Sequence, residues 1–321
     1  MIEKVLIGAM LFACGHFGAL AQSFPERPVR ILVGYPPGGG TDLVARLVAQ
    51  PLGERWKQPV IVENRPGAAA IIATEAVVKA KPDGYTLLMA YATELALNPA
   101  THKALPYEPV RDLAPIAQLA SAPLVLAVHP SVGAQSVRDL VALAKAKPGV
   151  LSYSSSGSGS VHHFAGELFK LRSGADMVHV PYKGSGPATA DAVSGQVQVT
   201  FASVASVLRF VQAGRLRALA VTSRERSSQL ADVPTAIEAG VAGVELTSWY
   251  GLLAPAGTPA SVIDKVAADV AAVLALAEVQ KGFSAQGLDM AKSSPASFAA
   301  FIREEAQKYA RIARASNIQQ E

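Results

Sequence analysis

The sequence has almost no cysteine. Cys14 is the single cysteine among 321 residues, and it lies in the apolar N-terminal segment. The rest of the chain can therefore form no disulfide, and it offers no thiol nucleophile and no cysteine metal site. The H-E-x-x-H motif, the Walker phosphate loop and the G-x-G-x-x-G dinucleotide fingerprint are also missing. We therefore expect no metal and no cofactor.

Long apolar runs and blocks of like charge are missing as well. After the first 21 residues, no stretch is apolar for the roughly 18 residues that a membrane helix requires. Lys and Arg number 29 against 25 Asp and Glu, a net charge of +4, and this excess is spread thinly. The pattern argues against nucleic-acid binding and membrane-surface binding. The small positive balance slightly favours an anionic ligand.

The first residues predict export. Lys4 precedes an apolar run over 5–13, and Ala19-Leu20-Ala21 places small residues where a signal peptidase cleaves. We expect a signal peptide over 1–21, cleaved between Ala21 and Gln22, and a periplasmic mature protein. The residues before Cys14 also resemble a lipoprotein cleavage site, so lipid attachment at Cys14 stays open as a second interpretation.

The rest of the chain alternates short β-rich runs with helical patterns, which predicts an α/β fold. A second set of strands and helices begins near residue 123. The last two predicted helices, over 261–277 and 295–315, have no sheet of their own and therefore cover the first one. We predict two lobes, each a mixed sheet flanked by helices, with a cleft and a hinge between them. The predicted boundaries are 22–122 plus 244–321 for lobe 1 and 123–243 for lobe 2.

A glycine-rich loop, 36–42, joins a predicted strand to a helix that Thr41 is expected to cap. Glycines let the backbone approach a ligand closely, and the first amides of a helix are free donors at its positive end. Such a loop binds an anion without a basic side chain. A plain tight turn is the other interpretation, in which Asp42 is only a first-turn dipole partner.

A serine-rich loop, 154–160, lies at a second strand–helix junction and leads into His162 and His163. Serine hydroxyls and backbone amides together can surround a carboxylate. We expect His162 to be exposed and His163 to be buried or to cap the helix. A flexible turn and acyl transfer by a serine beside a histidine are the other interpretations, although G-x-S-x-G does not occur here. If the two loops are the site, valine at Gly39 or Gly157 should weaken binding at least about tenfold.

Further junctions add candidates on the expected cleft walls. Tyr182 can lie along a wall, and Lys183 offers a charge, although exposure to solvent is the commoner fate of a lysine. The candidate ligand-binding residues are Pro37, Gly38, Gly39, Gly40, Thr41, Asp42, Ala68, Thr93, Ser155, Ser156, Gly157, Ser158, Gly159, Ser160, Tyr182 and Lys183. No catalytic residue is predicted.

Seven motifs in order resemble one known family. They read RPVRILVGYPPGGGTDLVAR, VIVENRPGA, KPDGYTLL, SYSSSGSGSVHHFAGELF, VPYKGSGPA, DVPTAIEAG and WYGLLAPAGTP. The chain resembles the periplasmic receptors of tripartite tricarboxylate transporters, also called Bug-type receptors. In one departure, the chain has Ala68-Ala69-Ala70 where the family usually continues with more glycine, and this leaves ligand size open.

The resemblance implies a two-lobed "Venus flytrap" of the type II binding-protein class. It also implies carboxylated ligands held by backbone groups and bridging waters, at the loops 37–42 and 155–160, with Ala68 and Thr93 as further contacts. The expected partners are a small organic anion and the membrane permease subunits of the transporter, with no nucleic acid, and we expect a monomer. A periplasmic sensory protein and a secreted serine hydrolase are the competing functions.

Overall fold

The structure is a computed structural model, and it describes residues 24–318. The predicted signal peptide, its cleavage site and Cys14 lie outside the described residues. Within the described range, no helix is long and apolar enough to cross a membrane. The strands are β1 (Val29–Val33), β2 (Val60–Asn64), β3 (Thr86–Tyr91), β4 (Leu113–Val128), β5 (Ser152–Ser155), β6 (Val178–Pro181), β7 (Val199–Ser203), β8 (Arg217–Val221), β9 (Thr247–Pro255) and β10 (Asp289–Met290).

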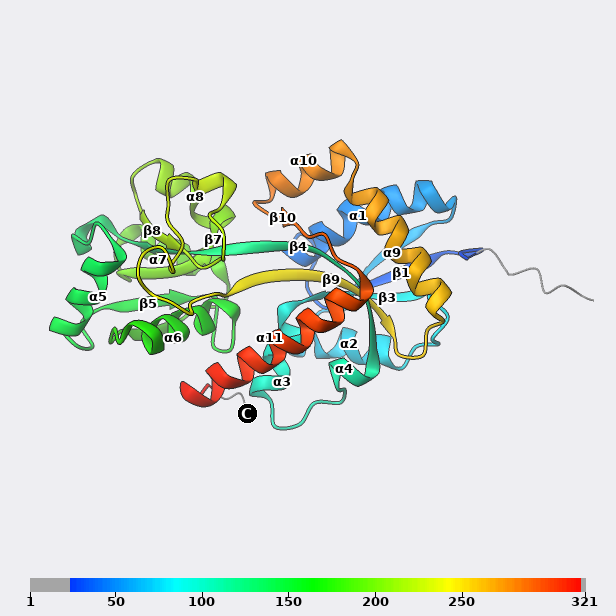
Figure 1. The fold of residues 1–321 in the computed structure, drawn as a ribbon, viewed down its shortest axis with the longest axis horizontal. Coiled ribbons are helices and arrows are strands. Elements are labelled where there is room, and N and C mark those ends of the chain that lie inside the picture. The colour runs from blue at the N-terminus through cyan, green and yellow to red at the C-terminus, as the bar shows by residue number, and fades with distance from the viewer. Residues whose placement is uncertain (1–23, 319–321) are drawn as a thin grey trace, which may run out of the picture.

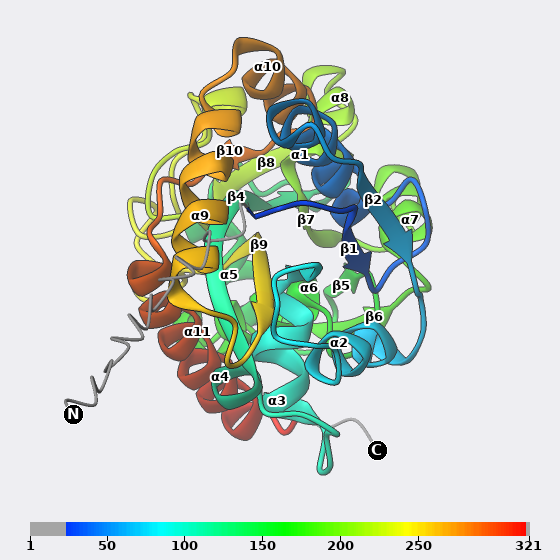
Figure 2. The ribbon, with the colours of Figure 1, turned by 90° about the vertical axis from the view of Figure 1, so that its right-hand side faces the viewer.

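Helices cover these strands on both sides. The α-helices are α1 (Gly40–Trp56), α2 (Ile71–Val78), α3 (Asn98–Thr101), α4 (Pro109–Asp112), α5 (Val137–Ala146), α6 (Val161–Ser173), α7 (Ser185–Ser194), α8 (Val204–Gln212), α9 (Ala260–Leu274), α10 (Ala277–Ala285) and α11 (Pro295–Ala315). Short helical turns are η1 (Ala68–Ala70), η2 (Thr93–Leu97), η3 (Pro130–Val132) and η4 (Ser228–Leu230). In the view of Figure 2, α1 and α10 lie above the central strands, and α2 and α3 lie below them.

Two long strands, β4 and β9, join the two halves of the molecule (Figure 1). β4 pairs with β9 over Leu113–Pro123 and with β7 over Leu124–Val128, so it belongs to the sheets of both lobes. The strand order is β2-β1-β3-β9-β4-β7-β5-β6. The predicted two-lobed fold, with a mixed sheet flanked by helices in each lobe, is confirmed. The residue boundaries of the lobes stay a prediction.

The strand directions make the two lobes face each other. β9 is antiparallel to β4 and β3 is antiparallel to β9, while β1 and β2 are parallel to β3. The strands β1, β2 and β3 therefore run the same way as β4, toward lobe 2. β7 is antiparallel to β4, and β5 and β6 are parallel to β7, so these three run toward lobe 1. The carboxyl ends of all six strands meet at the junction, where open α/β sheets bind ligands.

The C-terminal helices cover lobe 1, as the sequence predicts, but they are divided differently. α9 ends at Leu274, and α10 follows as a separate helix that the sequence pattern does not predict. α9 buries Val266 and Val270 in the core that α1 also covers. α11 packs directly on β9, because a Cβ at Gly251 would lie 2.1 Å from the Phe298 ring.

α11 also reaches lobe 2, where it passes beside α6 (Figure 1). The rings of Phe164 on α6 and Tyr309 on α11 lie edge to face, 5.1 Å apart. Near its middle, Glu305 accepts a hydrogen bond from the Trp249 indole at 3.0 Å. The apolar core is therefore continuous between the lobes on this side.

Candidate functional site

The glycine-rich loop ends at an uncapped helix. α1 begins at Gly40 with Gly39 as its N-cap, so the prediction that Thr41 caps this helix is wrong. Thr41 is buried instead, one position inside the first turn. Glycine has no side chain to accept a hydrogen bond, and no side chain of the described residues caps α1. The first amides of α1 are thus available as donors at the positive end of the helix.

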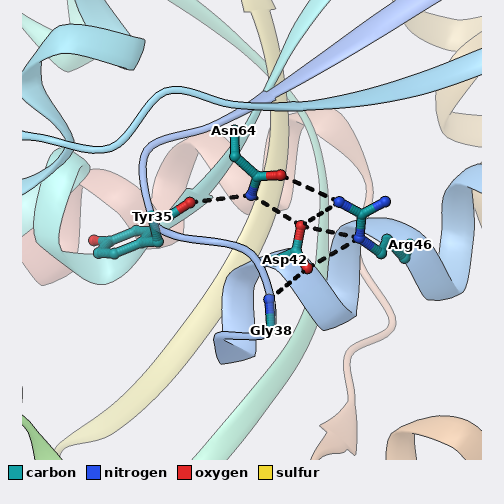
Figure 3. Close-up of polar contacts among 5 residues, drawn as sticks. All are labelled: Tyr35, Gly38, Asp42, Arg46 and Asn64. Atoms are coloured by element: carbon teal, nitrogen blue, oxygen red, sulfur yellow. Dashed lines mark hydrogen bonds and ion pairs between the residues drawn. The ribbon is translucent and has the colours of Figure 1, made fainter.

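Asp42 holds this loop in place (Figure 3). Its buried carboxylate accepts hydrogen bonds from the Gly38 amide at 2.9 Å, from Arg46 Nε at 3.0 Å and from Asn64 Nδ2 at 2.9 Å. Asn64 also donates to the Tyr35 carbonyl at 3.0 Å. Burial acts to raise the pKa of Asp42, but these hydrogen bonds outweigh it and keep the pKa below its ordinary value. With its acceptors engaged, Asp42 positions the loop, and the direct ligand contact expected from the sequence has no support in this geometry.

A cavity of about 330 Å³ lies where α1 begins. Its lobe 1 wall includes Gly38, Gly40 and Tyr250, and its lobe 2 wall includes Ser203 and Ser206. The two lobes touch nearby, where Gln229 Nε2 donates to the Ser284 carbonyl at 2.8 Å. Ser203 and Ser206 were not among the predicted contacts, because their strand–helix junction, FASVAS, contains no glycine.

The serine-rich loop of lobe 2 is closed by its own hydrogen bonds. Ser160 caps α6 by accepting from the His163 amide at 3.3 Å, and its hydroxyl donates to the Gly157 carbonyl at 2.6 Å. The Gly157 amide donates to Ser155 Oγ at 3.2 Å, and the Gly159 amide donates to His163 Nδ1 at 3.1 Å. Several backbone donors that the sequence assigns to a ligand are therefore occupied within the loop.

The loop after β6 lies against the serine-rich loop. The Tyr182 amide donates to the Ser155 carbonyl, and the Gly184 amide donates to the Ser156 carbonyl, both at 3.1 Å. The Tyr182 hydroxyl donates to Asp191 at 2.6 Å, which fixes the ring against α7. Lys183, next to Tyr182 in this loop, is exposed to solvent. The structure thus brings together the residues predicted in lobe 2.

The alanine segment after β2 has an unusual backbone. Ala68, Ala69 and Ala70 have φ angles of 47°, 50° and 68°, a region that residues with a Cβ occupy at a cost of about 1–3 kcal/mol each. The Asn98 amide group donates to the Ala69 carbonyl at 2.9 Å, and the Thr74 hydroxyl donates to the Ala70 carbonyl at 3.0 Å. These bonds keep residues 68–70 in the left-handed conformation, and Ala68 is exposed.

Glu94 lies fully buried behind the lobe 1 wall, next to the predicted contact Thr93. It belongs to η2, a five-residue π-helix, and such irregular helices are frequent at functional sites. Its Oε2 accepts from the Tyr35 hydroxyl at 3.0 Å and from the Tyr91 amide at 3.3 Å, while Oε1 finds no partner among the described residues. Burial raises the pKa of Glu94 to about 8. The sequence does not predict this role for Glu94, because its only signal is a lone acid before the segment LALNPA.

Ser155 and His179 are close enough to resemble a catalytic pair, with 2.6 Å between Oγ and Nε2. Ser155 is only 1% exposed, however, so a substrate cannot reach its hydroxyl in this geometry. Glu167, a carboxylate that acts electrostatically on His179, accepts from the Tyr153 hydroxyl at 2.7 Å and pairs with Lys170 at 2.9 Å.

The expectation that His162 is exposed is wrong, because it is 8% exposed and bonds Ser156 Oγ through Nδ1 at 2.7 Å.

Comparison with known proteins assigns the family. The family described as "Tripartite tricarboxylate transporter family receptor" matches residues 44–318. The chain belongs to this receptor family. This confirms the resemblance drawn from the seven motifs, and with it the expectation of a periplasmic solute receptor.

The similar proteins cover this receptor almost completely. Protein BugT of Bordetella pertussis is 37% identical over 295 residues, which cover 92% of this chain and 90% of BugT. An R. palustris protein solved with adipate has a TM-score of 0.80 and 33% identity, covering 92% of this chain and 99% of that one. MatC of Rhodopseudomonas palustris, solved with bound malate, has a TM-score of 0.76 and 29% identity, covering 90% and 99%. The ligand contacts assigned to individual residues of this receptor stay predictions.

Proposed function

We propose that this receptor binds a small organic anion with at least one carboxylate group between its lobes and delivers it to the membrane subunits of a tripartite tricarboxylate-type transporter. The observation that carries the proposal is the uncapped start of α1, which opens onto a cavity shared by both lobes. Helix amides at this end bind anions without a charged side chain. The adipate and malate bound by two similar proteins support a dicarboxylate.

The proposed contacts combine residues that line this cavity with residues predicted from the sequence on the facing ends of the two lobes. Gly40 and Thr41 supply the lobe 1 backbone donors, with Pro37, Gly38, Gly39, Ala68 and Thr93 on the same wall, while Asp42 keeps the loop in position by accepting from the Gly38 amide. Residues 156–160, Tyr182 and Lys183 form the lobe 2 side, while the buried Ser155 supports the loop through His179. Ser203 and Ser206, which line the cavity, join the proposed site.

A ligand that touches both lobes favours the closed form over the open one, so it shifts the population toward closure. It should therefore reduce the radius of gyration and raise the melting temperature by mass action. Adipate and malate are the first ligands to test, by calorimetry and small-angle scattering, and mass spectrometry of protein purified without added ligand identifies what it carries. Binding without compaction argues against hinge closure, and steady conversion of the ligand to a product argues for an enzyme.

The Lys183 side chain should contribute little to affinity. It is exposed to solvent, where water and salt weaken its attraction for an anion. Lys183→Ala is expected to weaken binding of adipate or malate by less than about tenfold. Calorimetry on both variants measures this, and a loss of a hundredfold or more would instead place the ammonium group directly on the ligand.

Transport and sensing share the same binding step, so uptake distinguishes them. Cells that lack this receptor should lose uptake of the identified ligand, and restoring the receptor should restore it. Normal uptake together with a lost transcriptional response to the ligand would favour the sensory function.

A further inference from the structure

Three histidines each hold one residue of the serine-rich loop. His179 Nε2 lies 2.6 Å from Ser155 Oγ, and His162 Nδ1 lies 2.7 Å from Ser156 Oγ. His163 Nδ1 accepts a hydrogen bond from the Gly159 amide at 3.1 Å. The loop is thus supported along its length by imidazole rings.

His163 differs from the other two in what it requires. A serine hydroxyl both donates and accepts, so His162 and His179 can keep their contacts in either protonation state. A backbone amide only donates, so the Gly159 contact exists only while His163 Nδ1 carries no proton. Protonation would point two N–H groups at each other and force the loop to move.

The surroundings of His163 oppose its protonation. Its ring stacks on His179 of β6 with centroids 3.8 Å apart and planes 6° apart, and His179 stacks in turn on Tyr153 of β5. Glu167 and Lys170 of α6 face the pair and are paired with each other, while Tyr309 of α11 contacts the adjacent Phe164. Burial, assisted by Lys170, lowers the pKa of His163 to about 4. Burial and His163 likewise lower the pKa of His179 to about 4.

Protonation of His163 destabilises the folded protein relative to the unfolded chain. The folded-state pKa of His163 lies below the ordinary value of 6.5, so the unfolded chain takes up its proton first as the pH falls. The contribution of neutral His163 is fully present above about pH 6.5 and is lost as the pH falls through about 4.

We propose that His163 is a positioning residue that sets the geometry of the serine-rich loop through Gly159, and that this makes anion binding sensitive to acid. The part concerning affinity rests on the proposed function. The part concerning loop geometry does not, because it is measurable without a ligand.

Amide hydrogen exchange of the ligand-free receptor tests the geometry. His163→Asn places an amide oxygen near the Nδ1 position, where it can accept from Gly159 but cannot be protonated, and His163→Leu removes the acceptor. At pH 7 the Gly159 amide should be protected in the wild type and in His163→Asn. Its protection factor should be at least about tenfold lower in His163→Leu. His129→Leu, at the end of β4 remote from the junction, is the matched control and should leave Gly159 unchanged.

Acidification separates positioning from a general structural role. After correction for intrinsic exchange rates, protection of Gly159 should fall between pH 6 and pH 4 in the wild type and persist in His163→Asn. Equal protection in the wild type and His163→Leu at pH 7 would overturn the proposal, as would a parallel fall of the wild type and His163→Asn in acid. The comparison of the wild type with His163→Asn remains decisive if the leucine variant does not fold.

Affinity is measured with adipate and malate on the wild type and His163→Asn at pH 7 and pH 4. Comparing the two proteins at one pH cancels the protonation of the ligand itself. The wild type should weaken more than the variant in acid. If neither compound binds at pH 7, the ligand class proposed above fails while the exchange result still decides the role of His163.

Discussion

Glu94→Gln should remove a pH-dependent loss of stability of about 3 kcal/mol between pH 5 and pH 8. The Glu94 carboxyl is fully buried, and burial raises its pKa to about 8. The unfolded chain releases this proton near the ordinary pKa of 4.5, whereas the folded protein retains it. The folded state is therefore progressively disfavoured as the pH rises from about 4.5 through 8.

Glutamine preserves the shape of Glu94 and can still accept from the Tyr35 hydroxyl and the Tyr91 amide. It cannot ionise, so this pH dependence disappears. Urea denaturation of both proteins at pH 5, 6.5 and 8 gives the difference in unfolding free energy, and the histidines cancel in that difference. Glu278→Gln, at an exposed position of α10, controls for loss of a carboxylate. A difference between the wild type and Glu94→Gln that stays constant with pH would mean that Glu94 is ionised in the folded protein.

Gly40→Val should weaken ligand binding about a hundredfold, or about 2.7 kcal/mol. A Cβ at this first residue of α1 would lie 2.7 Å from the Tyr250 hydroxyl, and both residues line the interlobe cavity. The added side chain fills the space in front of the helix amides. Loss of one or two charge-assisted hydrogen bonds, each worth about 1.5–3 kcal/mol, accounts for the magnitude.

The adjacent Gly39 provides the matched control. Its φ of −76° suits any residue, and a Cβ there would lie 3.4 Å from the Pro36 carbonyl, which is close to ordinary contact. Gly39→Val should therefore cost less than tenfold in affinity, in contrast to the expectation from the sequence. Calorimetry with adipate and malate, with circular dichroism to verify folding, compares the two. If Gly40→Val binds with the affinity of the wild type, the start of α1 is not part of the binding site.

The sequence could predict the fold because its signals are local and repeat along the chain. Small-residue loops between apolar runs predicted strand–helix junctions at Gly38–Gly40 and at Ser155–Ser160, and the structure places both at the facing ends of the lobes. The return of the chain to lobe 1 was predicted from the two C-terminal helices, which have no sheet of their own. What those loops bind stays a prediction.

The errors arise where tertiary contacts outweigh local pattern. Thr41 is a good N-cap residue by type, but the N-cap is Gly39, two residues earlier, and Thr41 is buried inside the helix. His162 and His163 are neighbours in sequence, and only the packing of α6 decides which ring is buried. The partners of Asp42 include Asn64, 22 residues away, and no spacing rule connects them. Glu94 lies among Tyr35, Tyr91 and Tyr250, and these residues are far apart in the sequence.

The paired strands β4 and β9 limit how the lobes can move. Where β4 passes from lobe 1 into lobe 2, its residues Ser121, Ala122 and Pro123 lie opposite Trp249, Ser248 and Thr247 of β9. Sliding one strand along the other would break the ladder and shift every side chain to a new partner, so this direction is stiff. Bending or twisting the ribbon as a whole keeps the pairs intact, so it is the soft mechanical coordinate. A single spectroscopic distance between one label on each lobe should therefore follow the whole opening and closing motion.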